Sequence, residues 1–577
     1  MGKPDIVKEL EPLFKPRSVA VIGATNNVGK WGFSTFFSLE SRFEGDLFAV
    51  NNRDPEILGR KAYKRVTDIP SPVDLAVIVI PPDKVAGVME DCVEKGIKAG
   101  VIITAGFAEV GPAGKAMQDE VVGIAKKGGI RLVGPNCMGM WSAPANLSAF
   151  MFPLPILEGP LALISQGGNV GGAMVSDAAS RGFGFQQYVS CGGTADIQIE
   201  DYIEYLGHDD KVKVIMVYIE GLGDGHRFVE KVREVTAKKP VVALKPGKTD
   251  AAVKAISSHS GSLSGTDTIY DAAFKKAGVI RTDTTMEMLD VAIGFLTQPL
   301  PKGPNVVITT PGGSYGVMAA DACASRGLNV IDLPPAVMDK FNSMFPSRWS
   351  HGNPVDPAGD RNFIQYIKTP EILLRHPEVE AVLFMGFGSM SGMSQTLSSA
   401  RGGAGRRMEG FKKRMEGIQE MARENIERLD SDDPVKIRQA VQAGFGMMFS
   451  SFLMTQSTDI EEFIELVSEA LTTEKMKKGP FFTGLKELFQ DMSADEFDPM
   501  KLVGIMGLMD PLLDGLINYW MEKYDKPLLT TTFTERTSQM GEGGHFPYPN
   551  AERASTVLAK LLEYKEYLDG IAAETDL

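Results

Sequence analysis

The chain has 577 residues, a formal net charge of -14 and four scattered cysteines with no C-x-x-C pair. This length predicts about three to five domains. The acidic balance argues against nucleic-acid binding, and the cysteine spacing against a disulfide framework or a zinc site, so no metal ligands are expected. The first residues do not resemble a signal peptide, and no run reaches the ~18 apolar residues of a membrane span. We therefore expect a soluble, cytoplasmic protein without a membrane segment.

Short apolar runs ending in Gly or Pro recur in three sets along the chain. They are rich in Val and Ile without strict alternation, as is typical of strands buried on both faces of a parallel sheet. Amphipathic stretches that fit helices lie between them. The first set comprises 18–24, 46–52, 74–82, 99–107 and 130–136; the second 160–168, 185–193, 212–221 and 240–247; the third 305–313, 328–335 and 380–388.

The alternation of strands and helices predicts an α/β fold of three doubly wound, Rossmann- or flavodoxin-like domains. We expect joins near residues 150 and 300, which gives domains 1–150, 151–300 and 301–577. Residues at about 391–505 differ, because Met and helix-forming residues dominate there before a strand-like run returns at 526–533. This stretch is interpreted as a Met-rich helical insertion into the third domain.

A Gly-rich turn, VAVIGATNNVGKWGF, follows the first predicted strand and precedes a helix. Backbone N–H groups at such a helix start can bind phosphate. The dinucleotide fingerprint would need Gly where Thr25 and Val28 stand, and Trp31 replaces the Ser or Thr of a Walker A loop. The turn alone predicts a nucleotide or phosphate ligand, with a bare strand-to-helix turn as the alternative.

One of the six histidines, His259, lies in SSHSGSLSG (257–265), where seven of nine residues are Ser or Gly. Such a segment offers hydroxyl groups and little bulk around the imidazole. Neutral imidazole is a nucleophile near pH 7, so His259 is a candidate for a covalent intermediate. From this segment alone, a loop histidine that caps a turn remains the alternative.

The second predicted domain holds further groups suited to such chemistry. ISQGGNVGGAM (164–174) runs from a strand into a helix, and Gly193 follows the next strand, so both places offer N–H groups to an anion. Glu220 ends another strand, where its carboxylate could hold one imidazole nitrogen and leave the other free.

At this point the chain resembles a known family, the nucleoside-diphosphate-forming acyl-CoA synthetases related to succinyl-CoA synthetase. The first domain is similar to the family's CoA-binding domain through KPRSVAVIGATNN, ITAGFAEVG and GPNCMGM. The second domain is similar through ALISQGGNVGGAM, YIEGLGDGHRF and SSHSGSLSGTDTIYDAAF. The third is similar through VVITTPGGSYGVMAADACASRGL and GNPVDPAGD. The resemblance covers most of residues 10–390 and, weakly, 520–565.

The resemblance implies an acid-thiol ligase, of the acetate–CoA ligase kind. Acyl-CoA and phosphate would give an acyl phosphate and free CoA, and a histidine would then carry the phosphoryl group to ADP or GDP, all reversibly. His259 matches the phosphohistidine, and Glu220 matches the acidic residue that orients it. The match to the phosphate site covers Ser165, Gln166, Gly167, Gly168, Asn169, Val170 and Gly193. A Ser is usual where Gly167 stands.

Coenzyme A is expected, as a substrate, at the strand ends of the first domain. Arg53 keeps a positive charge for its phosphates, where the family often has Lys. The residues matched to the CoA site are Gly23, Ala24, Thr25, Asn26, Asn51, Asn52, Arg53, Ile80, Pro81, Pro82, Thr104, Ala105, Gly106, Phe107, Asn136, Cys137 and Met138.

One part of the family pattern is missing from the sequence. Nothing after residue 300 resembles the family's nucleotide-binding ATP-grasp domain. The resemblance therefore implies a separate ATP-grasp, β-type subunit that holds ATP or ADP and Mg²⁺, in a hetero-oligomer. Two other functions stay open: a CoA-dependent acyl transferase or hydrolase, and a CoA-sensing scaffold without catalysis. The acyl group, a carboxylic acid in its free form, is not specified by the sequence.

Overall fold

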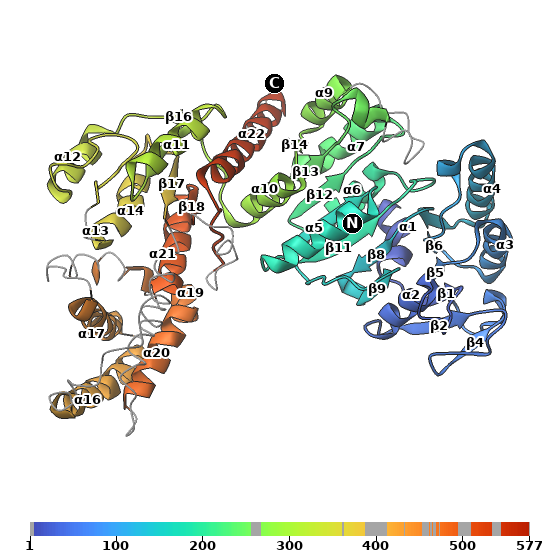
Figure 1. The fold of residues 1–577 in the computed structure, drawn as a ribbon, viewed down its shortest axis with the longest axis horizontal. Helices are drawn as coiled ribbons and strands as arrows, with labels where there is room; N and C mark the ends of the chain where they lie inside the picture. Colours follow the sequence, from blue (N-terminus) through green and yellow to red (C-terminus); the bar gives the residue numbers. More distant parts are fainter. Residues whose placement is uncertain are drawn as a thin grey trace. The chain divides into compact units, whose positions relative to one another are not determined.

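The computed structural model describes residues 5–254, 267–359, 363–386, 412–431, 433–452, 461, 464–465, 469–471, 473–493, 509–532 and 544–575. The chain divides into two compact units. The first comprises Met1–Leu296 together with Glu566–Leu577, and the second comprises Thr297–Lys565. Figure 1 labels most of the helices and strands of each unit.

The first sheet of the first unit has seven strands in the order β3-β4-β2-β1-β5-β6-β7. All neighbours are parallel except β3 and β4. The buried strands β1, β5 and β6 carry only small and β-branched or aliphatic residues, as expected between two helical layers. The strands are β1 Ser18–Ile22, β2 Asp46–Val50, β3 Glu56–Ile57, β4 Arg60–Tyr63, β5 Leu75–Ile78, β6 Ala99–Ile102 and β7 Arg131–Val133; the α-helices are α1 Asp5–Phe14, α2 Trp31–Glu40, α3 Val85–Lys95 and α4 Pro112–Gly128.

The second sheet of the first unit also has seven strands, in the order β14-β13-β12-β10-β11-β8-β9. Strands β10 to β14 are parallel, whereas β8 and β9 form an antiparallel hairpin on β11. The strands are β8 Gly139–Ser142, β9 Leu147–Phe150, β10 Leu161–Ser165, β11 Phe185–Ser190, β12 Val214–Tyr218, β13 Val241–Leu244 and β14 Ile280–Thr282; the α-helices are α5 Gly168–Ser180, α6 Ile199–Gly207, α7 Gly225–Thr236, α9 Asp267–Ala277 and α10 Thr285–Thr297.

The hairpin of β8 and β9 was not expected from the sequence. It lies within residues 1–150, which the sequence assigns to the first domain, yet it pairs with the second sheet. The hairpin continues that sheet beyond β11, whose outer edge would otherwise be open to other strands. Each of its strands has only four residues, too few to give a clear periodic signal.

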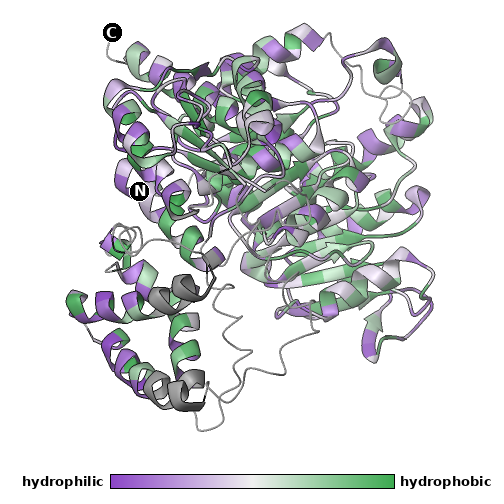
Figure 2. Ribbon diagram, turned by 60° about the vertical axis from the view of Figure 1, so that its left-hand side comes forward, coloured by the Kyte–Doolittle hydropathy of each residue, from purple (hydrophilic) through white to green (hydrophobic). Residues whose placement is uncertain are grey.

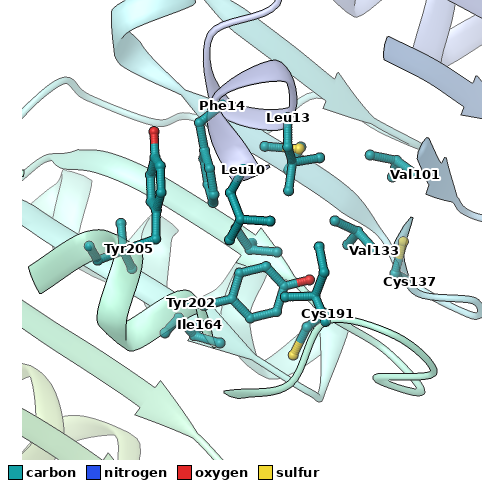
Figure 3. Close-up of a cluster of buried hydrophobic side chains, with 14 of the residues drawn as sticks. Leu10, Leu13, Phe14, Val101, Val133, Cys137, Ile164, Cys191, Tyr202 and Tyr205 are labelled. Atoms are coloured by element: carbon teal, nitrogen blue, oxygen red, sulfur yellow. The ribbon is translucent and has the colours of Figure 1, made fainter. Parts of the chain in front are cut away.

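Helix α1 and the second sheet's helix α6 pack together at the centre of the first unit. Leu10, Leu13 and Phe14 of α1 are fully buried, and the Phe14 ring stacks on Tyr205 of α6 with ring centroids 4.3 Å apart. Figure 3 shows these side chains beside Val101 and Val133 of the first sheet and Ile164 of the second. One hydrophobic core therefore includes residues of both sheets, which fixes the two sheets relative to each other.

The second unit contains a parallel four-stranded sheet in the order β16-β15-β17-β18. Helices occupy the described parts of the connection between β17 and β18, the region where the sequence predicts a helical insertion. Figure 2 shows hydrophobic residues concentrated in the sheets. The strands are β15 Asn305–Thr309, β16 Asn329–Val330, β17 Ala381–Met385 and β18 Leu528–Thr531; the α-helices are α11 Gly313–Ala324, α12 Pro335–Met344, α13 Phe363–Ile367, α14 Thr369–Leu374, α16 Lys412–Leu429, α17 Pro434–Phe452, α19 Glu474–Lys477, α20 Pro480–Ser493, α21 Met509–Tyr524 and α22 Ala551–Thr575. Helix α22 belongs to the second unit up to Lys565 and to the first unit from Glu566 on.

The α/β fold class predicted from the sequence is confirmed by these three parallel-dominated sheets. Among the described residues, no helix combines the length and the apolar character needed to cross a membrane.

A buried histidine in the second unit leads to a prediction about acid stability. His545 is fully buried with its Nε2 atom 2.5 Å from the Thr530 hydroxyl, and burial lowers its pKa to about 3. Between about pH 6.5 and 3 the unfolded chain then binds a proton that the folded chain does not, so stability falls as the pH falls, by at most about 1.4 kcal/mol per pH unit.

Replacing His545 with Gln removes the titrating group and keeps a hydrogen-bonding side chain. We expect the melting temperature of the second unit to fall less between pH 7 and pH 4.5 in His545→Gln than in the wild type, as measured by calorimetry. A half-buried histidine of the same unit, His376, is the control. Equal pH dependence in wild type and His545→Gln would contradict the prediction.

Candidate functional site

At the carboxyl end of the first sheet, the chain reverses its direction of winding at strand β1. Strand β1 lies between β2 and β5, so the loops after β1 and β5 diverge from this point, as at the ligand-binding edge of open α/β sheets. Gly23 has φ +100°, and a Cβ atom there would lie 2.2 Å from the carbonyl oxygen of Val79. Only glycine allows the two loops to approach this closely.

Several polar side chains predicted to bind CoA hold these loops instead. The Asn51 amide donates to the Ala24 carbonyl at 2.7 Å and accepts from the Arg53 N–H. The Asn26 amide donates to the Glu56 carbonyl, and the Thr104 hydroxyl donates to the Ile80 carbonyl at 2.7 Å. Backbone groups and the exposed side chains of Asn52 and Arg53 therefore remain available to a ligand at this edge.

The segment after β7 joins the carboxyl ends of the two sheets. The Asn136 N–H donates to the Thr104 carbonyl of the first sheet, and the Pro135 carbonyl accepts from the Gly193 N–H of the second, each at 2.9 Å. The Met138 N–H donates to the Ser190 hydroxyl at 3.0 Å. The predicted CoA-binding and phosphate-binding loops are thus fixed against each other within one unit.

A pocket of about 230 Å³ opens between these two sets of loops. Nine of the residues predicted from the sequence line it, from both the CoA and the phosphate groups of that prediction. They are Ala105, Asn136, Cys137, Met138, Gln166, Gly168, Asn169, Gly193 and Glu220. The other predicted CoA residues lie along the carboxyl edge of the first sheet, outside this pocket.

The turn from β10 into α5 forms one wall of the pocket. Ser165 is fully buried, and its hydroxyl donates to the Gly167 carbonyl at 2.7 Å. This hydroxyl therefore closes the turn and does not face the pocket. Gly168 begins α5, and the Met138 side chain packs on it, since a Cβ atom at Gly168 would lie 2.5 Å from the Met138 sulfur. The N–H groups at the start of α5 remain suited to an anion.

Two carboxylates and no Lys, Arg or His contribute to the described lining of the pocket. Glu220 follows β12 and is only 6% exposed. Glu109 accepts hydrogen bonds from the N–H groups of Gly106 and Phe107, at 2.5 and 3.1 Å. An anion in this pocket would meet negative charge, so it needs N–H donors or a cation that enters from outside the described lining.

Cys137 lines the pocket but is not suited to nucleophilic chemistry. Its thiol donates to the Ile102 carbonyl, and burial raises its pKa to about 12. The thiolate, which is the reactive form, is then scarce near neutral pH. The Tyr218 hydroxyl, whose pKa is raised to about 12 by burial and by the charge of Glu220, also stays protonated there.

His259, the predicted nucleophile, lies outside the described residues, as does the rest of segment 255–266. This segment belongs to the connection between β13 and β14. Strand β13 is parallel to β12 and next to it in the sheet. The connection therefore leaves the sheet at the same edge as Glu220.

Sequence reasoning missed several pocket residues. Trp31 is 54% exposed although it is large and apolar, and it contributes to the pocket with Met151 and Glu109. A sequence signal existed for Glu109, because an acidic residue three positions after Gly106 can cap free N–H groups. Trp31 and Met151 gave no such signal, since only the packing of the two sheets brings them together.

Comparisons with known proteins agree with this arrangement of the chain. Family models for a "CoA binding domain", a "Succinyl-CoA ligase like flavodoxin domain" and a "Ligase-CoA domain" match residues 17–142, 158–295 and 305–401. The chain is 43% identical over 374 residues to the α subunit of acetate–CoA ligase (ADP-forming) II of Pyrococcus furiosus, covering 65% of this chain and 81% of the relative. It is 40% identical to the acetate–CoA ligase (ADP-forming) of Methanocaldococcus jannaschii, of which it spans about half, 49%; that match covers 61% of this chain.

A solved structure is also similar. It is a dinucleotide-forming acetyl-coenzyme A synthetase 1 of Candidatus Korarchaeum cryptofilum in complex with phosphate and ADP. The TM-score is 0.66 at 25% identity, and the match covers 98% of each chain.

Proposed function

Because the chain belongs to the family of ADP-forming acyl-CoA ligases, we propose that it is the α-type subunit of such a ligase. It interconverts acyl-CoA, phosphate and ADP with a carboxylic acid, CoA and ATP. Acetate is the acyl group named for the relatives at 40–43% identity. The observation that carries this proposal is the single pocket shared by the CoA-type loops of the first sheet and by Glu220 of the second.

The reaction we propose has three steps. A phosphate oxygen attacks the thioester carbonyl, the C–S bond breaks, and CoA leaves as the thiol while an acyl phosphate forms. An imidazole nitrogen of His259 then attacks phosphorus, and the P–O bond to the acyl group breaks to release the carboxylate. Finally the phosphoryl group passes from the imidazole to the terminal oxygen of ADP, which gives ATP and restores His259.

The residues of the pocket fit these steps. The N–H groups at the start of α5 bind phosphate without a cation. The Gly193 N–H, which the sequence also suggested for this role, donates to the Pro135 carbonyl instead. The buried Glu220 accepts the N–H of the incoming imidazole, fixes its tautomer and stabilises the cationic form. The imidazole of His259 is neutral when it attacks and gains positive charge only as its nitrogen bonds to phosphorus, where the Glu220 carboxylate balances that charge. Val170, within the first turn of α5, completes the phosphate-binding segment.

We further propose that a partner subunit supplies the nucleotide site. The relatives at 42–43% identity are named as α subunits, which supports a second subunit. An ATP-grasp chain that carries ADP and Mg²⁺ would fill this role. A CoA-dependent transferase with a cysteine nucleophile is a weaker alternative, because the buried Cys137 thiol stays protonated.

The proposal is tested by incubating the purified chain with labelled phosphate and acetyl-CoA. We expect acid-labile, base-stable label on the protein, together with release of free CoA. Adding ADP and an ATP-grasp partner should move the label to ATP. If no member of a panel of acetyl-, branched, aryl- and dicarboxylic acyl-CoAs produces protein-bound label, the proposed function is wrong.

Substituting Gly23 with Ala should weaken CoA binding. The positive φ costs an L-residue about 1–2 kcal/mol, and the new Cβ atom would overlap the Val79 carbonyl. The loops after β1 and β5 must therefore separate, and we expect at least about a tenfold rise in the Kd for CoA by calorimetric titration. Gly59→Ala, at another positive φ but with nothing within 4 Å of the added Cβ, is the matched control. An unchanged Kd would show that the loops after β1 and β5 are not part of the CoA site.

A further inference from the structure

The side chain of Gln166 connects the phosphate-side turn of the pocket to the loop that carries Glu220. Its Oε1 atom accepts hydrogen bonds from the N–H groups of Glu220 and Gly221, at 2.5 and 3.0 Å. Its Nε2 atom donates to the Gly221 carbonyl at 3.0 Å. The Gln166 backbone N–H also donates to the Tyr218 carbonyl, at 3.1 Å. Four contacts thus hold the end of β12 and the loop after it to the residue that follows the neighbouring strand β10.

These contacts leave little of the Gln166 amide for a ligand. Both lone pairs of its oxygen and one of its two N–H donors are in use, and an amide has no further acceptor. A phosphate could compete only for the second N–H of Nε2. The direct phosphate contact predicted for Gln166 from the sequence is therefore not the main role that this geometry supports.

Gly167, the residue after Gln166, leaves space for the Tyr218 ring and the Glu220 carboxylate. A Cβ atom at Gly167 would lie 2.8 Å from the Tyr218 ring and 3.6 Å from a Glu220 carboxylate oxygen. Glycine at this position lets the Tyr218 ring and the Glu220 carboxylate approach the turn after β10. The turn and the Glu220 loop are therefore packed as well as hydrogen-bonded.

We infer that Gln166 is a positioning residue that fixes the Glu220 loop, and hence the carboxylate that orients the catalytic imidazole. This inference rests on the proposed function and deepens it. Buried backbone N–H groups are costly to leave unpaired, so loss of the amide releases the loop from its present geometry. A shift of about 1 Å in a positioning group can cost about 10²-fold in rate.

Two kinetic measurements distinguish a positioning role from a phosphate contact. In Gln166→Ala we expect the maximal rate of phosphohistidine formation to fall about 10- to 100-fold, with the KM for phosphate within about twofold of the wild type. When Gln166→Ala is added to Glu220→Gln, the maximal rate of phosphohistidine formation should fall by less than about a further threefold. The effects of two residues do not add when one acts through the other. A raised KM with an unchanged maximal rate, or additive losses, would overturn the inference.

Amide hydrogen exchange measures the structural part separately from activity. In Gln166→Ala, peptides covering 219–223 should exchange faster than in the wild type. Gln187 lies on strand β11 of the same sheet, and its side chain donates a hydrogen bond to Asp209. In Gln187→Ala, which breaks that bond, peptides covering 219–223 should exchange as in the wild type. Unchanged exchange in Gln166→Ala overturns the inference whatever the enzyme assay gives. If the wild type forms no phosphohistidine but exchange rises as expected, the proposed function fails and the role of Gln166 in holding the loop stands.

Discussion

A chain with His259 replaced by Ala should take up no phosphoryl group from phosphate and acetyl-CoA. Removing the imidazole removes the atom that attacks phosphorus, so the reaction stops at the acyl phosphate. Release of CoA in the first turnover should continue, because that step breaks a thioester and does not need the histidine. The measurement is single-turnover labelling of the protein alongside a thiol assay for free CoA.

The control for this experiment is a different histidine of the same unit. His226, in the first turn of α7, is exposed and is not among the residues that line the pocket. The His226→Ala chain should therefore label like the wild type. If His259→Ala retains acid-labile label, the phosphoryl acceptor is a different residue and the assignment of His259 is wrong.

Replacing Glu220 with Gln should slow phosphohistidine formation by about 10²- to 10⁴-fold. Gln has nearly the same shape, but it carries no charge to stabilise an imidazolium, and its amide can hold the wrong tautomer. The loss should lie in the rate of labelling, with CoA affinity unchanged, because the CoA loops belong to the first sheet. Rapid-quench labelling and a CoA titration on the same preparation measure both quantities.

A carboxylate away from the pocket is the control for Glu220. Glu230 is exposed on α7, and its replacement by Gln makes the same change of charge on the same unit. We expect wild-type labelling for Glu230→Gln. A Glu220→Gln chain that labels at the wild-type rate would show that the buried carboxylate does not act on the imidazole.

The pocket also bears on substrate choice within the proposed function. Trp31, Met138 and Met151 bring large apolar surfaces to a cavity that also presents amide groups and two carboxylates. Trp31 stands in the first turn of α2, immediately after the loop of Gly23. A small or apolar acyl group fits such a lining better than a dicarboxylic one, because Glu109 and Glu220 would repel a second carboxylate.

Much of the site was accessible from local sequence patterns. A run such as SVAVIG places Gly23 at the carboxyl end of a buried strand, and VYIEG does the same for Glu220. Parallel strands put all such ends at one edge of a sheet, so local sequence predicts which residues share an edge. The small residues around His259 similarly singled out that histidine without any knowledge of tertiary structure.

The roles of individual side chains were harder to predict from the sequence, because they depend on which neighbouring groups each side chain contacts in the folded protein. Asn26, Asn51 and Thr104 stand at the predicted edge, yet their polar atoms bind adjacent loops. Ser165 closes its own turn, and Gln166 holds the Glu220 loop. A polar residue at a strand end can contact a bound ligand or hold an adjacent loop by hydrogen bonds, and sequence spacing does not distinguish the two roles.

The sequence by itself determined the α/β class, the strand-end loops and the candidate nucleophile, because these follow from the periodicity and composition of short segments. Only the tertiary structure decided that the hairpin of β8 and β9 extends the second sheet and that α1 joins the two sheets through one core. The same packing brings Trp31, Glu109 and Glu220 to one pocket. These residues are far apart in the chain, and contacts of that kind depend on how whole sheets pack, which no local pattern encodes.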